Sequence, residues 1–249
     1  MTSSETAPAT WSDIANWYDR LLTSGSGPHD TALNCLADLL LPVEGLEVVD
    51  VACGQGIATR LTASLGASVV GADSSPTMIA NARRHGTPEG SEIRYVVADA
   101  QTLSPFDSGS FDAATCQLAL MDIPDLDAAL MAIARVLRPQ GWFAFVIGHP
   151  CFLVPHAQRV TIDEDRPAVT VTGYFNERFW RSSNPNGVRR AGNHHRMLST
   201  YLNALTRAGF DVEECQEPQA SDLLARQQPL YTEVPIFFGA RAQLRRDTR

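Results

Sequence analysis

The chain has 249 residues, of which 44% are hydrophobic, and its formal net charge is −8. This length and apolar content suffice for one sizeable domain with its own core. The negative charge is spread along the chain, which argues against nucleic acid or an anionic membrane surface as the main partner and favours an enzyme acting on a small molecule.

The N-terminus and the cysteines indicate the cellular setting. No apolar run reaches the length of a membrane span, and the opening MTSSETAPAT lacks the basic and apolar regions of a signal peptide. The five Cys residues are scattered and include no CxxC pair, so neither zinc nor a redox dithiol is indicated. We therefore expect a cytoplasmic protein with reduced thiols, no metal site and no membrane partner.

Hydrophobic periodicity predicts helices and strands in alternation. Before the first strand, Trp11, Ile14, Tyr18 and Leu21 lie at helical spacing, and a second helical segment covers about residues 32–41. Runs rich in Val, Ile and Phe then indicate strands at residues 46–52, 67–73, 93–99, 111–118 and 142–148. Their nearly continuous apolar character is typical of strands buried on both faces.

Helical stretches separate these strands, opening at Gly56, near Ser75 and around Leu126. This alternation predicts a parallel sheet covered by helices on both sides. After Gly148 the alternation stops until about residue 195, a length that is unusual for a loop without a function. It resumes with a helix at about residues 196–208 and ends in an apolar strand at about residues 234–240.

The loop after the first strand, in VVDVACGQGIATR, indicates a nucleoside site. Gly54 and Gly56 allow a sharp turn and a close approach of the backbone to a ligand, and the following helix offers free backbone N–H groups. Asp73 ends the next strand, where an acid accepts hydrogen bonds from ribose hydroxyls. A pyrophosphate is less favoured, because Thr59 occupies the place of the third glycine of a dinucleotide fingerprint.

Five segments together resemble the class I S-adenosylmethionine-dependent methyltransferases. The first motif of that family, an acid followed by three residues and then GxG, matches DVACGQG, which begins at Asp50. Further matches are VVGADSSPTMI, VVADAQTL, FDAATCQLAL and RVLRPQGWFAFV, in family order over residues 46–148. The later segment HHRMLSTYLNALTRAGF is similar to small bacterial methyltransferases of this class that act on small molecules.

The resemblance implies an α/β, Rossmann-like, doubly wound fold with a seven-stranded, mostly parallel sheet. Its last strand is expected to run antiparallel between its neighbours, with N-terminal helices before the sheet and an insertion after strand five. We expect a single methyltransferase domain, 1–249. Its parts are an N-terminal helical lid at 1–45, a cofactor-binding core at 46–148, a substrate-binding insertion at 149–195 and the C-terminal part of the sheet at 196–249.

The resemblance also implies a cofactor, S-adenosyl-L-methionine, with S-adenosyl-L-homocysteine as its product. Asp50 would help to hold the methionine ammonium, Asp73 the ribose hydroxyls and Asp99 the adenine amino group. The implied cofactor-binding residues are Tyr18, Asp50, Ala52, Cys53, Gly54, Gly56, Asp73, Ser74, Met78, Asp99, Ala100 and Gln117. Each Asp has the alternative of a helix N-cap or a turn residue, and Cys53 is interpreted as a packing residue.

Candidates for the acceptor site follow strands four and five. His149 stands at a predicted strand end, and an imidazole titrates near neutral pH, so it is the candidate general base. The alternative is a histidine that only bonds to the loop backbone. The candidate substrate-binding residues are Met121, Asp122, His149, Phe152, Tyr174, Phe179, Trp180, His194 and His195.

The expected reaction is methyl transfer to an O, N or C nucleophile of a small organic acceptor, aromatic or natural-product-like, as in secondary metabolism. One alternative is a protein of the same fold that binds S-adenosylmethionine without methyl transfer, as a cyclisation catalyst or a sensor. A less favoured one is an NAD(P)-dependent oxidoreductase, against which the missing third glycine argues. A monomer or a homodimer is expected.

Overall fold

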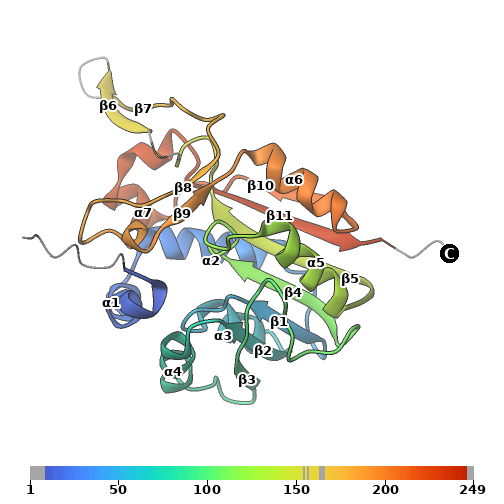
Figure 1. The fold of residues 1–249 in the computed structure, drawn as a ribbon. Helices are drawn as coiled ribbons and strands as arrows, with labels where there is room; N and C mark the ends of the chain where they lie inside the picture. The colour runs from blue at the N-terminus through green and yellow to red at the C-terminus, as the bar shows by residue number, and fades with distance from the viewer. Residues whose placement is uncertain (1–8, 154, 156, 163–165, 246–249) are drawn as a thin grey trace, which may run out of the picture.

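A seven-stranded sheet forms the centre of the computed structural model, which describes residues 9–153, 155, 157–162 and 166–245 (Figure 1). The strand order is β10-β11-β5-β4-β1-β2-β3. The strands are β1 (Glu47–Val51), β2 (Ser68–Asp73), β3 (Glu92–Val97), β4 (Phe111–Gln117), β5 (Leu137–Gly148), β10 (Phe210–Gln216) and β11 (Phe237–Leu244). The order reverses between β1 and β4, so a crevice is expected at the carboxyl ends of these two strands.

The directions of the strands confirm the predicted topology. Strands β3, β2, β1, β4 and β5 pair in parallel, whereas β11 pairs antiparallel with both β5 and β10. The last strand begins at Phe237 rather than at the predicted Val234. Pro235 intervenes, and because proline lacks a backbone N–H it cannot donate to a sheet ladder.

Helices cover both faces of the sheet (Figure 1). One face packs against α5 (Leu126–Val136) and α6 (Leu198–Arg207), the other against α2 (Gly27–Leu39), α3 (Ile57–Ser64) and α7 (Asp222–Gln227). Two further helices, α1 (Trp11–Thr23) and α4 (Pro76–Arg84), pack against each other. The predicted N-terminal helices are therefore present.

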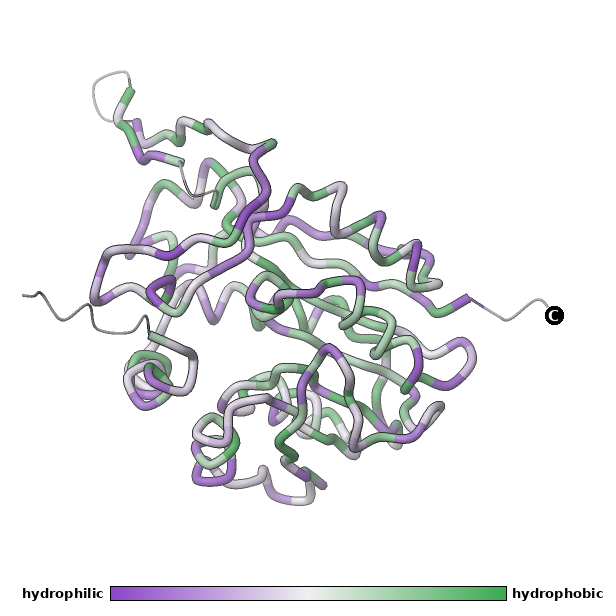
Figure 2. Tube along the Cα trace, in the orientation of Figure 1, coloured by the Kyte–Doolittle hydropathy of each residue, from purple (hydrophilic) through white to green (hydrophobic). Residues whose placement is uncertain are grey.

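The core consists of the apolar side chains that alternate along the central strands. Val49 and Val51 of β1 pack on the α5 and α6 side, whereas Val48 packs on the α2 side. Figure 2 shows apolar segments along the central strands and polar ones on the outer loops. Because both faces are covered, polar residues within β1 and β4, such as Asp50 and Thr115, are buried.

The segment after β5 contains two small antiparallel sheets that the sequence pattern did not predict. The hairpin of β6 (Gln158–Ile162) and β7 (Arg166–Thr170) extends from the body, and β8 (Arg178–Trp180) pairs with β9 (Asn193–His195) (Figure 1). The short helix η2 (Val188–Ala191) precedes β9, and η3 (Pro229–Thr232) follows α7. Strands β6, β7 and β8 consist of exposed and partly buried residues, and β9 has only three residues, all polar, so none of the four carries a long continuous apolar run. In the part of the chain that the structure describes, no helix is long and apolar enough to cross a membrane.

Candidate functional site

The loop between β1 and α3 turns through three residues with positive φ. Ala52 has φ 53°, Gly54 φ 56° and Gly56 φ 81°. Alanine rarely adopts this conformation, which costs about 1–2 kcal/mol for a residue with a Cβ. Leu118, at the end of the adjacent strand β4, has φ 55°. Such strain concentrates at functional sites, and here it lies at the carboxyl ends of the two strands where the order reverses.

Gly56 serves the packing of this loop. A Cβ at this position would collide with the hydroxyl and ring of Tyr95 on β3, whereas a Cβ on Gly54 would meet nothing within 4 Å. Gly56 is also the N-cap of α3. Gly56 does not line the cavity described below, so the structure does not support its predicted contact with the cofactor. Its lack of a side chain instead allows α3 to approach β3.

We expect Gly56→Ala to lower the free energy of unfolding by about 2–4 kcal/mol, since it combines a positive φ with a steric collision. Gly54→Ala is the matched control, because it has the positive φ without the collision, and should cost about 1–2 kcal/mol. Urea unfolding of both variants measures the difference. Equal losses would contradict the role assigned to Tyr95.

Asp50 is fully buried at the end of β1 and is held on both oxygens. Its Oδ2 accepts a hydrogen bond from the Thr59 hydroxyl at 2.6 Å, and its Oδ1 accepts one from the Thr115 hydroxyl at 2.8 Å. Burial raises the pKa of Asp50 to about 6, although the two threonines favour the charged form. The carboxylate thus links β1, α3 and β4 at the crevice.

Asp73, at the end of β2, orders the glycine loop. Its Oδ2 accepts from the Gly54 backbone N–H at 2.9 Å, and its Oδ1 accepts from the Ser75 N–H at 2.8 Å. Burial raises the pKa of Asp73, and these two backbone donors oppose the shift. Each oxygen keeps a second lone pair for a ligand. A cation between Asp50 and Asp73 would favour the ionised form of both acids.

These acids line a cavity of about 310 Å³ at the carboxyl ends of the strands. Twelve of the predicted site residues line it: Tyr18, Asp50, Ala52, Cys53, Gly54, Asp73, Ser74, Met78, Asp99, Ala100, Gln117 and Asp122. The same cavity is lined by residues that the sequence analysis did not propose: Trp11, Leu22, His29, Gln55, Ile57, Ala58, Ala98, Gln101, Leu118, Ala119, Ile123 and Pro124. Six of the latter are sequence neighbours of a predicted site residue, so the motifs already indicated their location, whereas no motif indicated His29.

Gln55 provides a test of the ligand that fits this cavity. The side chain is 4% exposed and lines the cavity, and its Oε1 is buried without a hydrogen-bond partner in the described part of the chain. A buried unpaired acceptor costs about 1–3 kcal/mol, so a donor from a ligand is expected there. Together with Asp50, Asp73 and Asp99, this oxygen makes a donor-rich, positively charged ligand suitable.

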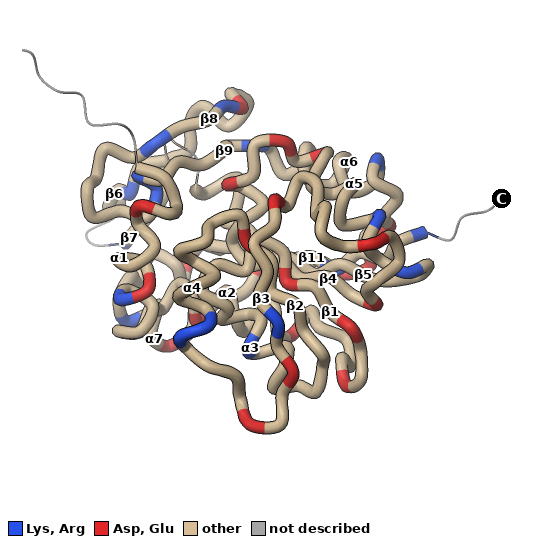
Figure 3. The backbone as a smooth tube through the Cα atoms, turned by 60° about the horizontal axis from the view of Figure 1, so that its bottom comes forward, with Lys and Arg blue, Asp and Glu red and all other residues tan. Residues whose placement is uncertain are grey.

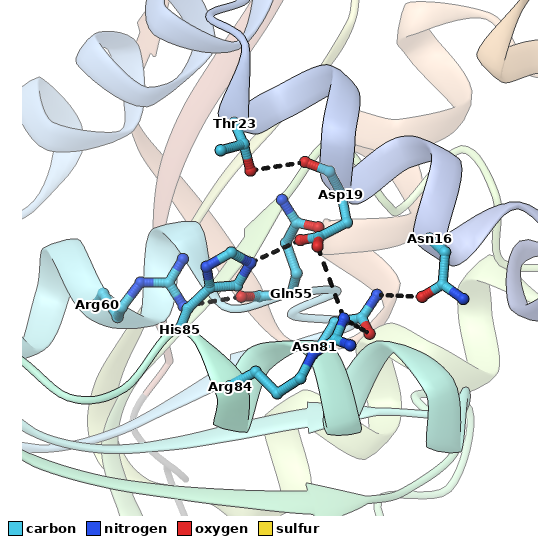
Figure 4. Close-up of polar contacts among 8 residues, drawn as sticks. All are labelled: Asn16, Asp19, Thr23, Gln55, Arg60, Asn81, Arg84 and His85. Carbon is cyan, nitrogen blue, oxygen red and sulfur yellow. Dashed lines mark hydrogen bonds and ion pairs between the residues drawn. The ribbon is translucent and has the colours of Figure 1, made fainter.

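Helix α1 lies beside the cavity and is joined to α4 by polar side chains (Figure 4). Asp19 Oδ1 and His85 Nε2 lie 2.6 Å apart, and Asn81 donates to Asn16 Oδ1 at 3.3 Å. On the insertion side, the Arg190 guanidinium lies 3.9 Å from the ring centroid of Trp17. The helix therefore bridges α4 and η2 over the crevice.

At one end of the cavity, four polar side chains gather. Asp122 Oδ1 accepts from Arg189 Nη1 at 3.1 Å, and the Tyr18 hydroxyl shares a 2.5 Å hydrogen bond with His29 Nε2. Burial raises the pKa of Asp122 to about 7, although the charges of Arg189 and Arg196 oppose the shift. Burial and the charge of Arg189 lower the pKa of His29 to about 4, so the imidazole is neutral.

The segment around Asp122 is held by the end of the insertion and by Arg196, which directly follows it. The Arg196 guanidinium donates to the carbonyls of Leu120, Ile123 and Pro124 at 2.7–3.1 Å, and the His194 N–H donates to the Met121 carbonyl at 2.7 Å. Met121 is buried in the core beside this loop and does not line the cavity. The conformation of this end of the cavity thus depends on side chains that lie about seventy residues later in the chain.

His149 does not lie in the cavity. It is 2% exposed, its Nδ1 accepts from the Cys151 N–H at 3.1 Å, and its Nε2 hydrogen-bonds to Glu217 Oε1 at 2.8 Å. Because Nδ1 accepts, Nε2 carries the proton and donates to the carboxylate. Neither ring nitrogen is free to accept a substrate proton. This geometry favours the alternative interpretation, a histidine that supports its loop, over the general base.

The other predicted acceptor residues lie outside the cavity as well. His195 Nε2 hydrogen-bonds to the Tyr174 carbonyl oxygen at 2.8 Å. The ring of Phe179 packs against the ring of His194. Phe152 and Trp180 line a second cavity, of about 210 Å³. Of these predicted residues, Tyr174, Phe179, His194 and His195 therefore contact one another within the insertion, whereas Phe152 and Trp180 line the second cavity.

Among the described residues, no group of three or more His, Cys, Asp or Glu side chains is arranged to hold a metal ion. Cys53 is free, and burial raises the pKa of its thiol well above the usual value. A thiol of high pKa is a poor nucleophile. The interpretation of Cys53 as a packing residue is consistent with this.

Comparisons with known proteins agree with this geometry. A protein family described as "Methyltransferase domain" matches residues 49–145. The Ubiquinone biosynthesis O-methyltransferase of Xanthomonas oryzae pv. oryzae is 39% identical over 101 residues, which cover 41% of this chain and 42% of that protein. The match thus spans less than half of the length of this curated relative.

Solved structures match over most of the chain. The S-adenosylmethionine-dependent methyltransferase from Mesorhizobium loti is 30% identical, with a TM-score of 0.71 over 88% of this chain and 99% of that one. A structure from Listeria monocytogenes, 22% identical, has a TM-score of 0.72 over 87% and 99% of the two chains. The second of these similarities supports the fold alone.

Proposed function

Because this chain belongs to the S-adenosylmethionine-dependent methyltransferases, we propose that it transfers the methyl group of S-adenosylmethionine to a small organic acceptor. The observation that carries the proposal is the cavity at the strand ends, which is lined by Asp50, Asp73, Asp99 and Gln55, whose buried Oε1 has no hydrogen-bond partner among the described residues. Three acids and an acceptor amide suit a sulfonium cofactor that also carries an ammonium and a ribose diol.

Individual residues take the following roles in this proposal. The second lone pairs of Asp73 accept from the ribose hydroxyls, and Asp99, with the apolar side chain of Met78, binds the adenine. The oxygen of Gln55 and the backbone of the glycine loop receive the amino acid part, while Asp50 fixes the end of β1 beneath it. When bound, the cofactor supplies a methyl carbon activated by a positively charged sulfur, which becomes a neutral thioether.

The acceptor end of the cavity is the cluster of Tyr18, His29, Asp122 and Arg189. As the methyl group moves to a lone pair of the acceptor and its bond to sulfur breaks, the proton of the acceptor would pass to the Asp122 carboxylate. The raised pKa of Asp122, about 7, makes it a suitable base near neutral pH. Arg189 keeps the carboxylate oriented and stabilises its charged form. We assign the role of general base to Asp122 in place of His149.

The acceptor is a small organic molecule with an O, N or C nucleophile. The match to the ubiquinone O-methyltransferase covers 101 residues, or 42% of that protein, and the family match ends at residue 145, so the choice of acceptor is assigned to the insertion that follows. Release of S-adenosylhomocysteine over a panel of phenols, amines and carbon acids, with mass spectrometry of the products, tests the proposal. A new product heavier by one methylene supports it; cofactor binding without a methylated product from any class would indicate a binding protein of the same fold.

We further propose that α1 and the insertion close over the cofactor and exclude water during transfer. Trp11, Tyr18 and Leu22 line the cavity, and the contacts of Asp19 and Trp17 connect α1 to α4 and η2. Hydrogen exchange in residues 11–24 and 149–195 should slow when S-adenosylhomocysteine is added. Equal exchange with and without the nucleoside would contradict the lid.

A further inference from the structure

A second cavity, of about 210 Å³, lies between the β6–β7 hairpin, the turn after β5, β8 and η3. Its described lining combines aromatic rings, aliphatic side chains and two arginines, principally Phe152, Leu153, Arg159, Trp180, Arg189 and Tyr231. The described lining residues of this cavity and of the cofactor cavity are entirely different. The second cavity is therefore a separate site, and a molecule bound in it is not the methyl acceptor.

The charge of the second cavity is positive. Two guanidiniums line it, and no carboxylate does among the lining residues that the structure describes. Asp122 balances Arg189, but Arg159 donates to the neutral Tyr231 hydroxyl at 2.9 Å, with its guanidinium carbon 5.3 Å from that ring's centroid. Figure 3 shows basic segments around β6 and β8. An anionic group is the ligand that this arrangement favours.

Trp180 adds a second sign of a ligand. It lines the cavity, and its indole N–H is buried without an acceptor in the described part of the chain. The rings of Phe152 and Tyr231 present flat apolar surfaces, which pack well against a planar molecule. The lining thus combines an unused donor, a cation and aromatic walls, which suit an aromatic carboxylate.

Arg189 links this cavity to the proposed base. Its side chain lines the second cavity, and its Nη1 donates to Asp122, which lines the first, at 3.1 Å. The pair is largely buried, with exposed side-chain fractions of 24% for Arg189 and 11% for Asp122, so solvent screens its charges only weakly. A guanidinium carries five N–H donors, so a second carboxylate can bind to the same group from the other cavity.

The other charged and titratable groups around Asp122 do not make this connection. The described groups that face it are Arg189 of η2, Arg196 before α6, Tyr18 of α1, Tyr201 of α6 and Cys116 of β4. Of these, only Arg189 also lines the second cavity. An anion beside Arg189 adds negative charge and competes with Asp122 for the guanidinium, and both effects favour the protonated form of Asp122.

We propose that the second cavity is a regulatory site for a small planar aromatic carboxylate, which slows methyl transfer by competing with Asp122 for the guanidinium of Arg189. Arg159 and Arg189 bind the carboxylate, and the indole N–H of Trp180 donates to one of its oxygens. The ring packs against Phe152 and Tyr231. The regulatory effect rests on the proposed function, in which Asp122 is the base, whereas the binding itself does not.

Calorimetry on the protein without cofactor or acceptor tests the binding. The probes are benzoate, salicylate and cinnamate, each compared with its neutral carboxamide. We expect the acids to bind about tenfold or more tightly than the amides, because a charge-assisted hydrogen bond is about twice as strong as a neutral one. Arg159→Gln should remove the difference, while Arg94→Gln, at an exposed position of β3, should keep it. Trp180→Phe should weaken acid binding about threefold, through the lost donor.

Initial rates of methyl transfer, with and without a saturating acid, test the regulatory effect. At about pH 7 the acid should lower kcat/KM about fivefold, and the rise of kcat/KM with pH should move upward by about one pH unit. At about pH 9 the inhibition should disappear, because Asp122 is then deprotonated with or without the acid. Excess acceptor should not relieve the inhibition, since the two molecules occupy different cavities. In Arg159→Gln the acid should not change that variant's own rate.

Several outcomes would overturn the inference: no binding of any acid, equal affinity for acids and amides, an unchanged preference in Arg159→Gln, or inhibition that excess acceptor relieves. Binding of the acids without any change in rate or pH profile would contradict the regulatory effect. The comparison of acids with amides on the unmodified protein needs no variant, so a misfolded variant does not affect it. Acid binding in a protein that binds no S-adenosylhomocysteine would instead contradict the proposed function and leave the second site standing.

Discussion

Asp122→Asn should lower kcat by about 10²–10³, because the asparagine cannot take the proton of the acceptor. Asparagine has nearly the same shape and its Oδ1 can still accept from Arg189, so affinity for S-adenosylhomocysteine should change by less than about twofold. Steady-state kinetics with a productive acceptor, together with calorimetry, separates these two effects.

The pH dependence provides the second readout for Asp122. Its pKa lies at about 7 in the free protein, and the base acts only when it is deprotonated. Therefore kcat/KM should rise as the pH increases from about 6 to about 8, and this rise should be absent in the Asp122→Asn variant. A variant with full turnover and an unchanged profile would show that Asp122 is not the base.

His149→Asn is the matched comparison. An asparagine oxygen can replace Nδ1 as the acceptor of the Cys151 N–H, in the manner of an Asx turn, so the loop is retained. We expect its kcat to stay within about twofold of the unmodified protein, because the imidazole lies outside the cavity. A loss of 10² or more, by the magnitude of general base catalysis, would restore His149 as the base.

Asp73→Ala should weaken S-adenosylhomocysteine binding by about 1–3 kcal/mol, that is, by about five- to 150-fold. The variant loses the proposed contacts with the ribose hydroxyls and also the acceptors of the Gly54 and Ser75 N–H groups, so the glycine loop loses its support. Asp107→Ala, an exposed acid outside the cavity, is the control and should bind normally. Binding of Asp73→Ala within twofold of the control would contradict the ribose assignment.

The cofactor half of the site was predictable because its residues are local to strand ends. Asp50, Gly54 and Asp73 follow apolar runs whose parallel pairing brings their ends to one edge, so the motif and the fold specify the same place. The antiparallel last strand followed from the family resemblance, but it begins later than predicted, at Phe237 after Pro235, and extends beyond Ala240 to Leu244. Local pattern and topology were sufficient here.

The acceptor half was not predictable in this way. The role of His149 depends on Glu217, which is 68 residues later in the chain, and the environment of Asp122 depends on Arg189. The contact of Tyr18 with His29 likewise joins two helices. Such pairings are set by tertiary packing, and no periodicity of a single sequence encodes them. The residue types of the insertion indicated that it contributes to a site, but the sequence did not indicate which residues they would contact.

Isothermal titration of the purified protein with S-adenosylhomocysteine, and separately with NADH, tests the central claim most directly. The account predicts stoichiometric binding of the sulfur nucleoside, with affinity that falls in Asp73→Ala and persists in Asp122→Asn, and no binding of NADH. Binding of NADH, with none of S-adenosylhomocysteine or S-adenosylmethionine, would contradict it.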